Sequence, residues 1–179
     1  MADNNNHCIK VLDSDLTLSS SFGNEGSGDG QFKNPYDVAF DSTGNVYVAD
    51  QNNHRVQVFT AEGKYLKQFG SYGSGSGELN GPNGICIDAK DVVYVTEWHN
   101  SRISVYYGYQ DNIDDFSVPK FLKSFSYLGS KQEQFKSPCG IAIGKDENVY
   151  IADLANNRIQ IYIRSKDKGD SLVTLMTDE

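Results

Sequence analysis

The sequence predicts an all-β fold, a β-propeller of four-stranded antiparallel blades. Short runs rich in Val, Ile, Tyr and Phe alternate with turns rich in Gly, Asn and Asp, and such runs are too short and too β-branched to favour helices. No segment shows helical periodicity. Four runs recur in a fixed order, and the equivalent prolines Pro35, Pro82 and Pro138 stand 47 and 56 residues apart, close to the period of propeller blades.

Each repeat contains the same succession of strands, from the innermost to the outermost. The first run contains a proline near its start and covers residues 34–41, 81–88 and 137–144. The second ends on an acidic residue and covers 46–50, 93–97 and 149–153. The third begins with arginine and covers 55–59, 102–106 and 158–162, and the fourth covers 65–70 and 121–125. Gly-containing breaks such as 43–45 and 62–64 fit hairpin turns.

These runs divide the chain into four segments. We expect the outer half of a blade at residues 1–23, full blades at 24–70 and 71–126, and a blade with a C-terminal tail at 127–179. The third segment owes its extra length to a polar, acidic stretch at 108–115, which we place in a surface loop. A set of three and a half blades cannot close a ring. We therefore expect a fragment or a start at an internal methionine, or else self-association through open blade edges.

Composition narrows the classes of function. The 179 residues carry a net charge of -8, which disfavours nucleic-acid binding. No run reaches the ~18 apolar residues of a membrane span, and the N-terminal residues do not form a signal peptide, so we expect a soluble, cytoplasmic chain. Cys8, Cys86 and Cys139 are widely spaced and match neither a disulfide framework nor a zinc motif. No cofactor and no metal are expected.

The motifs carry a family resemblance. The patterns G-x-F-x-x-P-x-x-[IV]-A-[FI]-D, N-[IV]-Y-[IV]-A-D and N-x-R-[IV]-Q-[IV]-[FY] resemble the NHL repeat from about Ala2 to about Tyr162. The resemblance implies a propeller, usually of six blades, most like the C-terminal domain of tripartite-motif NHL proteins. In those relatives the propeller selects targets, whereas an N-terminal RING supplies ubiquitin-ligase activity. This chain has no Cys/His-rich region, so ligase activity would belong to a longer parent.

An acid and an arginine flank the second hairpin turn of each full blade. The pairs are Asp50 with Arg55, Glu97 with Arg102, and Asp153 with Arg158. These carboxylates have two interpretations: metal ligands or catalytic acids, or structural clamps with bidentate arginine geometry. Their recurrence in every blade favours the clamps. In the first segment Cys8 takes the arginine position, which leaves Asp3 without this partner.

The binding surface is expected where the entries of the innermost strands meet the second hairpin turns. The blades differ most there, at Tyr36, Asp37, Gln51, Asn52, His54, Asn83, Trp98, His99, Asn100 and Cys139. We predict that Trp98 lies in an exposed turn, as a protein hot spot or a base-stacking platform, or else flat on the next blade. His7, His54 and His99 fall in turns of successive blades, which favours polar turn residues over a converging metal site.

The leading hypothesis is a non-catalytic scaffold that binds a protein or a ubiquitination substrate. The first alternative is RNA binding, which the net charge and the few lysines beside Asp37 and Glu97 disfavour. The second alternative is a metal-dependent propeller lyase or hydrolase. The Gly-rich stretches 23–30 and 70–77 lack the Gly-Lys-Ser/Thr ending of a phosphate loop, so we interpret them as blade connectors.

Overall fold

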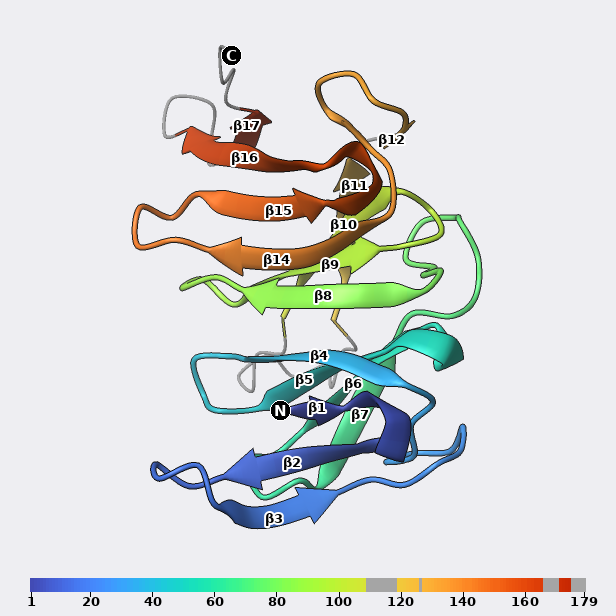
Figure 1. The fold of residues 1–179 in the computed structure, drawn as a ribbon, viewed down its shortest axis with the longest axis vertical. Coiled ribbons are helices and arrows are strands. Elements are labelled where there is room, and N and C mark those ends of the chain that lie inside the picture. The colour runs from blue at the N-terminus through green and yellow to red at the C-terminus, as the bar shows by residue number, and fades with distance from the viewer. Residues whose placement is uncertain (109–118, 126, 166–170, 175–179) are drawn as a thin grey trace.

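The strands form small sheets that follow one another along the long axis of the molecule (Figure 1). The computed structural model describes residues 1–108, 119–125, 127–165 and 171–174. Within these ranges there is no α-helix, and no helix is long and apolar enough to cross a membrane. Four antiparallel sheets of three or four strands confirm the all-β prediction of propeller blades.

The first sheet is the smallest. It pairs β1 (Ala2–Asp3), β2 (Cys8–Leu12) and β3 (Leu18–Phe22). The sequence predicted two strands here, and β1 adds a third because the first residues pair with Cys8 and Ile9 of β2.

The other three sheets each have four strands in sequence order. The second contains β4 (Pro35–Phe40), β5 (Val46–Asp50), β6 (Arg55–Phe59) and β7 (Tyr65–Phe69). The third contains β8 (Pro82–Ile87), β9 (Val92–Glu97), β10 (Arg102–Tyr107) and β11 (Phe121–Phe125). The fourth contains β14 (Pro138–Ile143), β15 (Val149–Asp153), β16 (Arg158–Ser165) and β17 (Ser171–Thr174). Residues 109–115 of the predicted surface loop and the last five residues of the tail lie outside the described residues.

Short elements connect the blades. A parallel pair, β12 (Tyr127–Leu128) and β13 (Gln134–Phe135), lies in the connector that precedes β14. There are three 3-10 turns among the described residues: η1 (Asn4–Asn6) follows β1, and η2 (Gln51–Asn53) and η3 (Leu154–Asn156) follow β5 and β15, the second strands of their sheets. We call the end of the sheets that carries these turns, the turn 98–101 and the starts of β4, β8 and β14 the η face; it lies at the right in Figure 1.

The cores lie between neighbouring sheets. Alternate residues of each strand point to opposite faces, so a sheet with a neighbour on each side, such as the second or the third, contributes to two interfaces. One cluster joins Tyr47, Val56 and Val58 of the second sheet to Ile85 and Val93 of the third. A second, equivalent cluster joins the third sheet to the fourth. Because each interface is built from apolar side chains of two blades, the blades hold one another in place.

Candidate functional site

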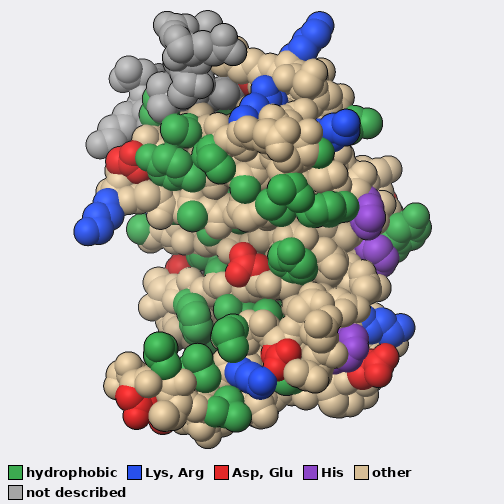
Figure 2. Space-filling model, in the orientation of Figure 1, with side chains coloured by type: hydrophobic (Ala, Val, Ile, Leu, Met, Phe, Trp, Pro, Cys, Tyr) green, Lys and Arg blue, Asp and Glu red, His purple; other side chains and the backbone are tan. Residues whose placement is uncertain are grey.

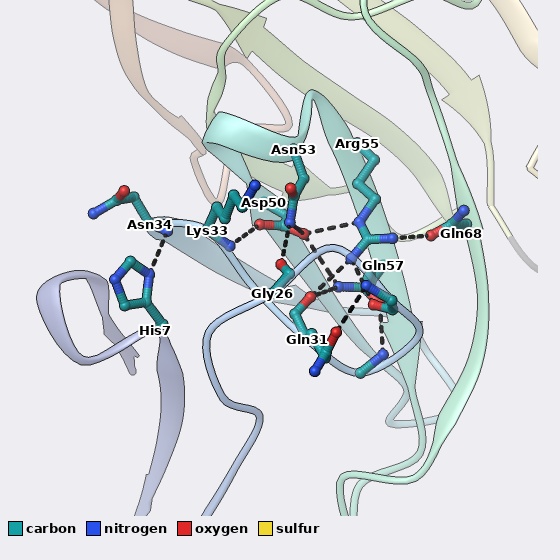
Figure 3. A network of polar contacts seen from close by, with 12 residues as sticks. His7, Gly26, Gln31, Lys33, Asn34, Asp50, Asn53, Arg55, Gln57 and Gln68 are labelled. Carbon is teal, nitrogen blue, oxygen red and sulfur yellow. Dashed lines mark hydrogen bonds and ion pairs between the residues drawn. The ribbon is translucent and has the colours of Figure 1, made fainter.

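The acid–arginine pairs form, and each is the centre of a wider network. In the second sheet Asp50 is fully buried, and Arg55 Nε donates to its Oδ2 at 2.8 Å (Figure 3). The backbone N–H of Lys33 donates to Oδ1 at 2.8 Å, while Asn53 Nδ2 and Gln57 Nε2 donate to Oδ2. With all these donors around it, the carboxylate is used for structure.

The arginines do not adopt the expected bidentate geometry. Only Nε of Arg55 donates to the carboxylate; its Nη2 donates to the carbonyl oxygens of Gly28 and Gln31, and its Nη1 to Gln68. Arg102 and Arg158 likewise donate through Nη to carbonyl oxygens of the preceding connectors. The guanidinium therefore joins both strands of the second hairpin to the preceding connector.

In the first sheet the equivalent acid pairs with a lysine instead of an arginine. Asp3 does have a cationic partner, because Lys10 Nζ lies 2.5 Å from its Oδ2. Hydrogen bonding to Lys10, and then to Asn6, lowers the pKa of Asp3. Lys10 stands at the position of Gln57 and not at that of Arg55, so the alignment of the arginine positions did not indicate it.

Two histidines fasten one blade to the next. Nδ1 of His7 accepts the backbone N–H of Asn34 at 3.0 Å, and Nδ1 of His54 accepts that of Gly81 at 3.1 Å. Both histidines have a left-handed backbone, with φ of 53° and 54°, which closes the 3-10 turn. The histidines lie along the η face (purple, Figure 2), but the described residues contain no group of three or more His, Cys, Asp or Glu placed to hold a metal.

The ten residues predicted for the binding surface differ in their exposure to solvent. Tyr36, Asn52 and His99 are exposed. Asn83 is 1% exposed and has no described hydrogen-bond partner. The remaining predicted face residues are half-buried: Asp37, Gln51, His54, Trp98, Asn100 and Cys139.

Trp98 is only half-buried, between the two alternatives predicted for it. Its backbone N–H donates to the carbonyl oxygen of Gly81 at 3.0 Å, which holds the turn against the entry of β8. Leu154, at the equivalent position, is 51% exposed.

Two acids of this face, Glu97 and Asp37, present little free charge. Glu97 is fully buried and accepts from Arg102 Nε at 2.6 Å. Asp37 accepts the backbone N–H groups of Ile85 and Val38, and its burial raises the pKa of its carboxyl group. Lys33 is exposed at the entry of β4, and the equivalent Lys136 is also exposed. Around these residues the η face is therefore less acidic than the net charge implied.

A buried threonine that the sequence reasoning missed joins the third and fourth sheets. Thr96 Oγ1 accepts the N–H of Gly84 at 2.7 Å and donates to the carbonyl oxygen of Cys139 at 2.6 Å. The equivalent residues are Ala49 and Ala152, so no repeated pattern could have indicated it. Cys86, close by, is buried, and this burial raises the pKa of its thiol, which keeps it from acting as a nucleophile.

Comparison with known proteins supports the repeat assignment. The model of the NHL repeat matches residues 32–59, 79–106 and 135–162. Each match begins in a connector and ends in the third strand of a sheet. The chain thus carries three NHL repeats. A search of curated proteins found no match.

Solved structures resemble the whole described fold. A streptogramin B lyase aligns with a TM-score of 0.64 and 17% identity, over 96% of this chain and 48% of that one. Virginiamycin B lyase from Staphylococcus aureus aligns at 0.62 and 14%, over 98% and 50%. The WD40 repeats of RRP9 align at 0.65 and 12%, over 97% and 46%. The chain spans about half the length of these proteins, and at such identities the likeness shows the propeller fold alone.

Proposed function

We propose that this NHL propeller segment is a non-catalytic scaffold that binds a protein partner on its η face. The contrast between a constant frame and variable positions supports the proposal. Every full blade repeats the acid–arginine network, while the residues at the strand entries and second hairpin turns differ between blades. The exposed ones among them include Tyr36 and Leu154. Exposed aromatic and aliphatic side chains on a rigid frame suit a protein interface.

The carboxylates argue against catalysis on this face. The acid that recurs in each of the three repeats, Asp50, Glu97 or Asp153, is buried and accepts several hydrogen bonds. A general acid or base, in contrast, must reach a substrate. We further propose that the parent protein is a tripartite-motif-like ubiquitin ligase and that the propeller selects its substrates. The NHL repeats support this finer proposal, and cytoplasmic location is part of it.

One pair of tyrosines gives a matched test. Tyr36 is 50% exposed on the η face, and Tyr107 is 54% exposed at the opposite end of the sheets. We expect Tyr36→Ala to weaken the capture of protein partners, measured by quantitative mass spectrometry against wild type, and Tyr107→Ala to leave it unchanged. Equal capture by both variants would contradict the proposal.

RNA binding is the second candidate, favoured by exposed Lys33 close to Tyr36 at the entry of β4. An RNA titration at two salt concentrations separates it from protein binding, because phosphate contacts weaken steeply with salt. Saturable, salt-dependent binding that Lys33→Ala and Tyr36→Ala both weaken would favour RNA over a protein partner.

A further inference from the structure

Two Asn-Gly pairs stand close together where the chain enters β8: Asn80-Gly81 and Asn83-Gly84. An asparagine before glycine is chemically labile. The glycine nitrogen can attack the side-chain carbonyl carbon of the asparagine, and glycine has no Cβ that would obstruct the approach. The sequence contains no other Asn-Gly pair. The surroundings of the two pairs differ, and this difference decides which of them can react.

The backbone nitrogen of Gly81 lies against a base. Its N–H donates to Nδ1 of His54 at 3.1 Å, within the distance over which a general base takes up a proton. Because Nδ1 accepts this hydrogen bond, the neutral imidazole carries its own proton on Nε2. Burial lowers the pKa of His54, and neighbouring His99 lowers it further, so the ring is neutral at pH 7. Its lone pair is therefore available to the Gly81 nitrogen.

The side chain of Asn80 is not held in place. Asn80 is half-buried, and its carboxamide forms no hydrogen bond with the described residues. Its backbone, in contrast, is fixed: the N–H donates to Oε2 of Glu97 at 3.0 Å, and the carbonyl oxygen accepts the N–H of His99 at 3.3 Å. The carboxamide can therefore turn toward the Gly81 nitrogen while that nitrogen stays bonded to His54.

The second pair has neither feature. Asn83 is 1% exposed, which keeps out the water that completes a deamidation. The N–H of Gly84 donates to Oγ1 of Thr96 at 2.7 Å, and this hydroxyl donates its own proton to the carbonyl oxygen of Cys139. A neutral hydroxyl group is not a base at pH 7. The pair Asn83-Gly84 is therefore an internal control for Asn80-Gly81.

We propose that Asn80 is a site of self-modification, where His54 promotes conversion of the asparagine to aspartate and isoaspartate. Nδ1 of His54 takes the proton from the Gly81 nitrogen, and this nitrogen forms a bond to Cγ of Asn80. The Cγ–Nδ2 bond breaks, and Nδ2 receives the proton from His54 and leaves as ammonia. Water then opens the cyclic imide at either of its carbonyl groups. The reaction consumes one water, releases one ammonia and needs no oxidant or reductant.

The product changes the η face. The new carboxylate lies next to Glu97, which accepts the N–H of residue 80, and like charges repel. Isoaspartate also adds one backbone atom immediately before Gly81, whose carbonyl oxygen holds the N–H of Trp98. The entry of β8 and the turn 98–101 are therefore displaced from one another. The reaction belongs to the chain itself, so the proposal does not depend on the proposed function.

Peptide mapping tests the proposal with the whole 179-residue chain. The folded protein is incubated at neutral pH, and samples taken over time are digested with trypsin, with a zero-time sample as the correction for deamidation during digestion. One tryptic peptide, residues 68–90, contains both pairs, so fragmentation in the mass spectrometer compares them in the same molecule. We expect deamidation at Asn80 to be at least about tenfold faster than at Asn83. In urea, where His54 no longer contacts Gly81, the two rates should be similar.

Two matched variants separate catalysis from a structural role. His54→Asn removes the base but keeps a side-chain acceptor, as Asn157 does at the equivalent position of the fourth sheet, and should slow deamidation at Asn80 at least about fivefold. A histidine that only holds the chain would give the opposite result, because a loosened chain reacts faster. His7→Asn, the same change where the N–H of Asn34 is bound, should leave the rate unchanged. Equal rates at the two pairs of the folded chain, an unchanged or faster rate in His54→Asn, or an equal decrease in His7→Asn would each overturn the proposal.

Discussion

Replacement of Asp50 by asparagine measures how much one acid–arginine network contributes to stability. The Asp50 carboxylate is fully buried and accepts hydrogen bonds from Arg55 Nε, Lys33 N, Asn53 Nδ2 and Gln57 Nε2, at 2.8, 2.8, 2.9 and 3.2 Å. Asparagine preserves the volume but removes the charge and turns one acceptor into a donor among donors. The side chain of Arg55, only 7% exposed, becomes a buried cation without a counter-charge. Breaking such a pair costs about 3–5 kcal/mol, a large share of the roughly 5–15 kcal/mol that stabilises a domain.

The chain contains its own control for this magnitude. Asp153 is equally buried, but the side chain of Arg158 is 30% exposed, so water continues to solvate the cation when Asp153→Asn removes its partner. We expect about 1–3 kcal/mol for that variant, toward the range of hydrogen bonds to charged groups. Exposed Asp15, which accepts from Thr17, serves as the surface reference, because substitutions on the surface change stability little.

Urea unfolding followed by circular dichroism gives the free energy of unfolding of each variant. The expected order of destabilisation is Asp50→Asn, then Asp153→Asn, then Asp15→Asn. An Asp50→Asn protein within about 0.5 kcal/mol of the Asp15→Asn protein would refute the reasoning, since that is the ordinary range of surface substitutions. The reverse order of the two buried sites would refute the burial argument specifically.

Three further predictions concern the contacts between blades. Thr96→Val leaves the buried N–H of Gly84 and the partly buried carbonyl oxygen of Cys139 without their hydroxyl partner, so urea unfolding should show a loss of about 1–3 kcal/mol. Gly84→Ala places a Cβ 2.2 Å from a backbone carbonyl oxygen of β14 and should lower the midpoint of thermal unfolding, whereas Gly140→Ala, with its nearest atom at 3.8 Å, should not. Burial lowers the pKa of His54, and the positive charge of neighbouring His99 lowers it further. As the pH falls through about 6.5, the unfolded chain therefore binds a proton at this histidine before the folded chain does, and the free energy of unfolding decreases. His54→Asn should flatten that part of a stability curve measured between pH 7 and pH 5, and an unchanged slope would contradict the assignment.

Signals that occur three times could be predicted from the sequence. The strands and the acid–arginine pairs recur in every full blade, so their alignment identifies them without any knowledge of contacts. The geometry of the pairs could not be predicted in the same way. The connectors whose carbonyl oxygens bind each guanidinium differ in sequence and contribute backbone atoms, which carry no residue signature.

Features that occur once were missed for a related reason. Thr96 replaces alanine at a buried position, and Lys10 replaces glutamine, so both stand outside the repeated pattern although both form direct contacts. The partial burial of Trp98 accompanies a turn that lies against the entry of β8 in the same sheet. That contact uses backbone atoms, which carry no residue signature.

The networks also bear on how the η face can bind. In each full blade the arginine donates hydrogen bonds to carbonyl oxygens of the connector. The acid accepts a hydrogen bond from the backbone N–H of the residue two positions before the proline of the innermost strand. The connector, the second hairpin turn and the strand entry are therefore fixed to one another before any partner arrives. Binding to a surface that is already ordered loses less conformational entropy than binding to mobile loops. The repeated polar residues thus give the variable positions between them a rigid support. Which partner the face binds then depends on the few side chains that remain exposed.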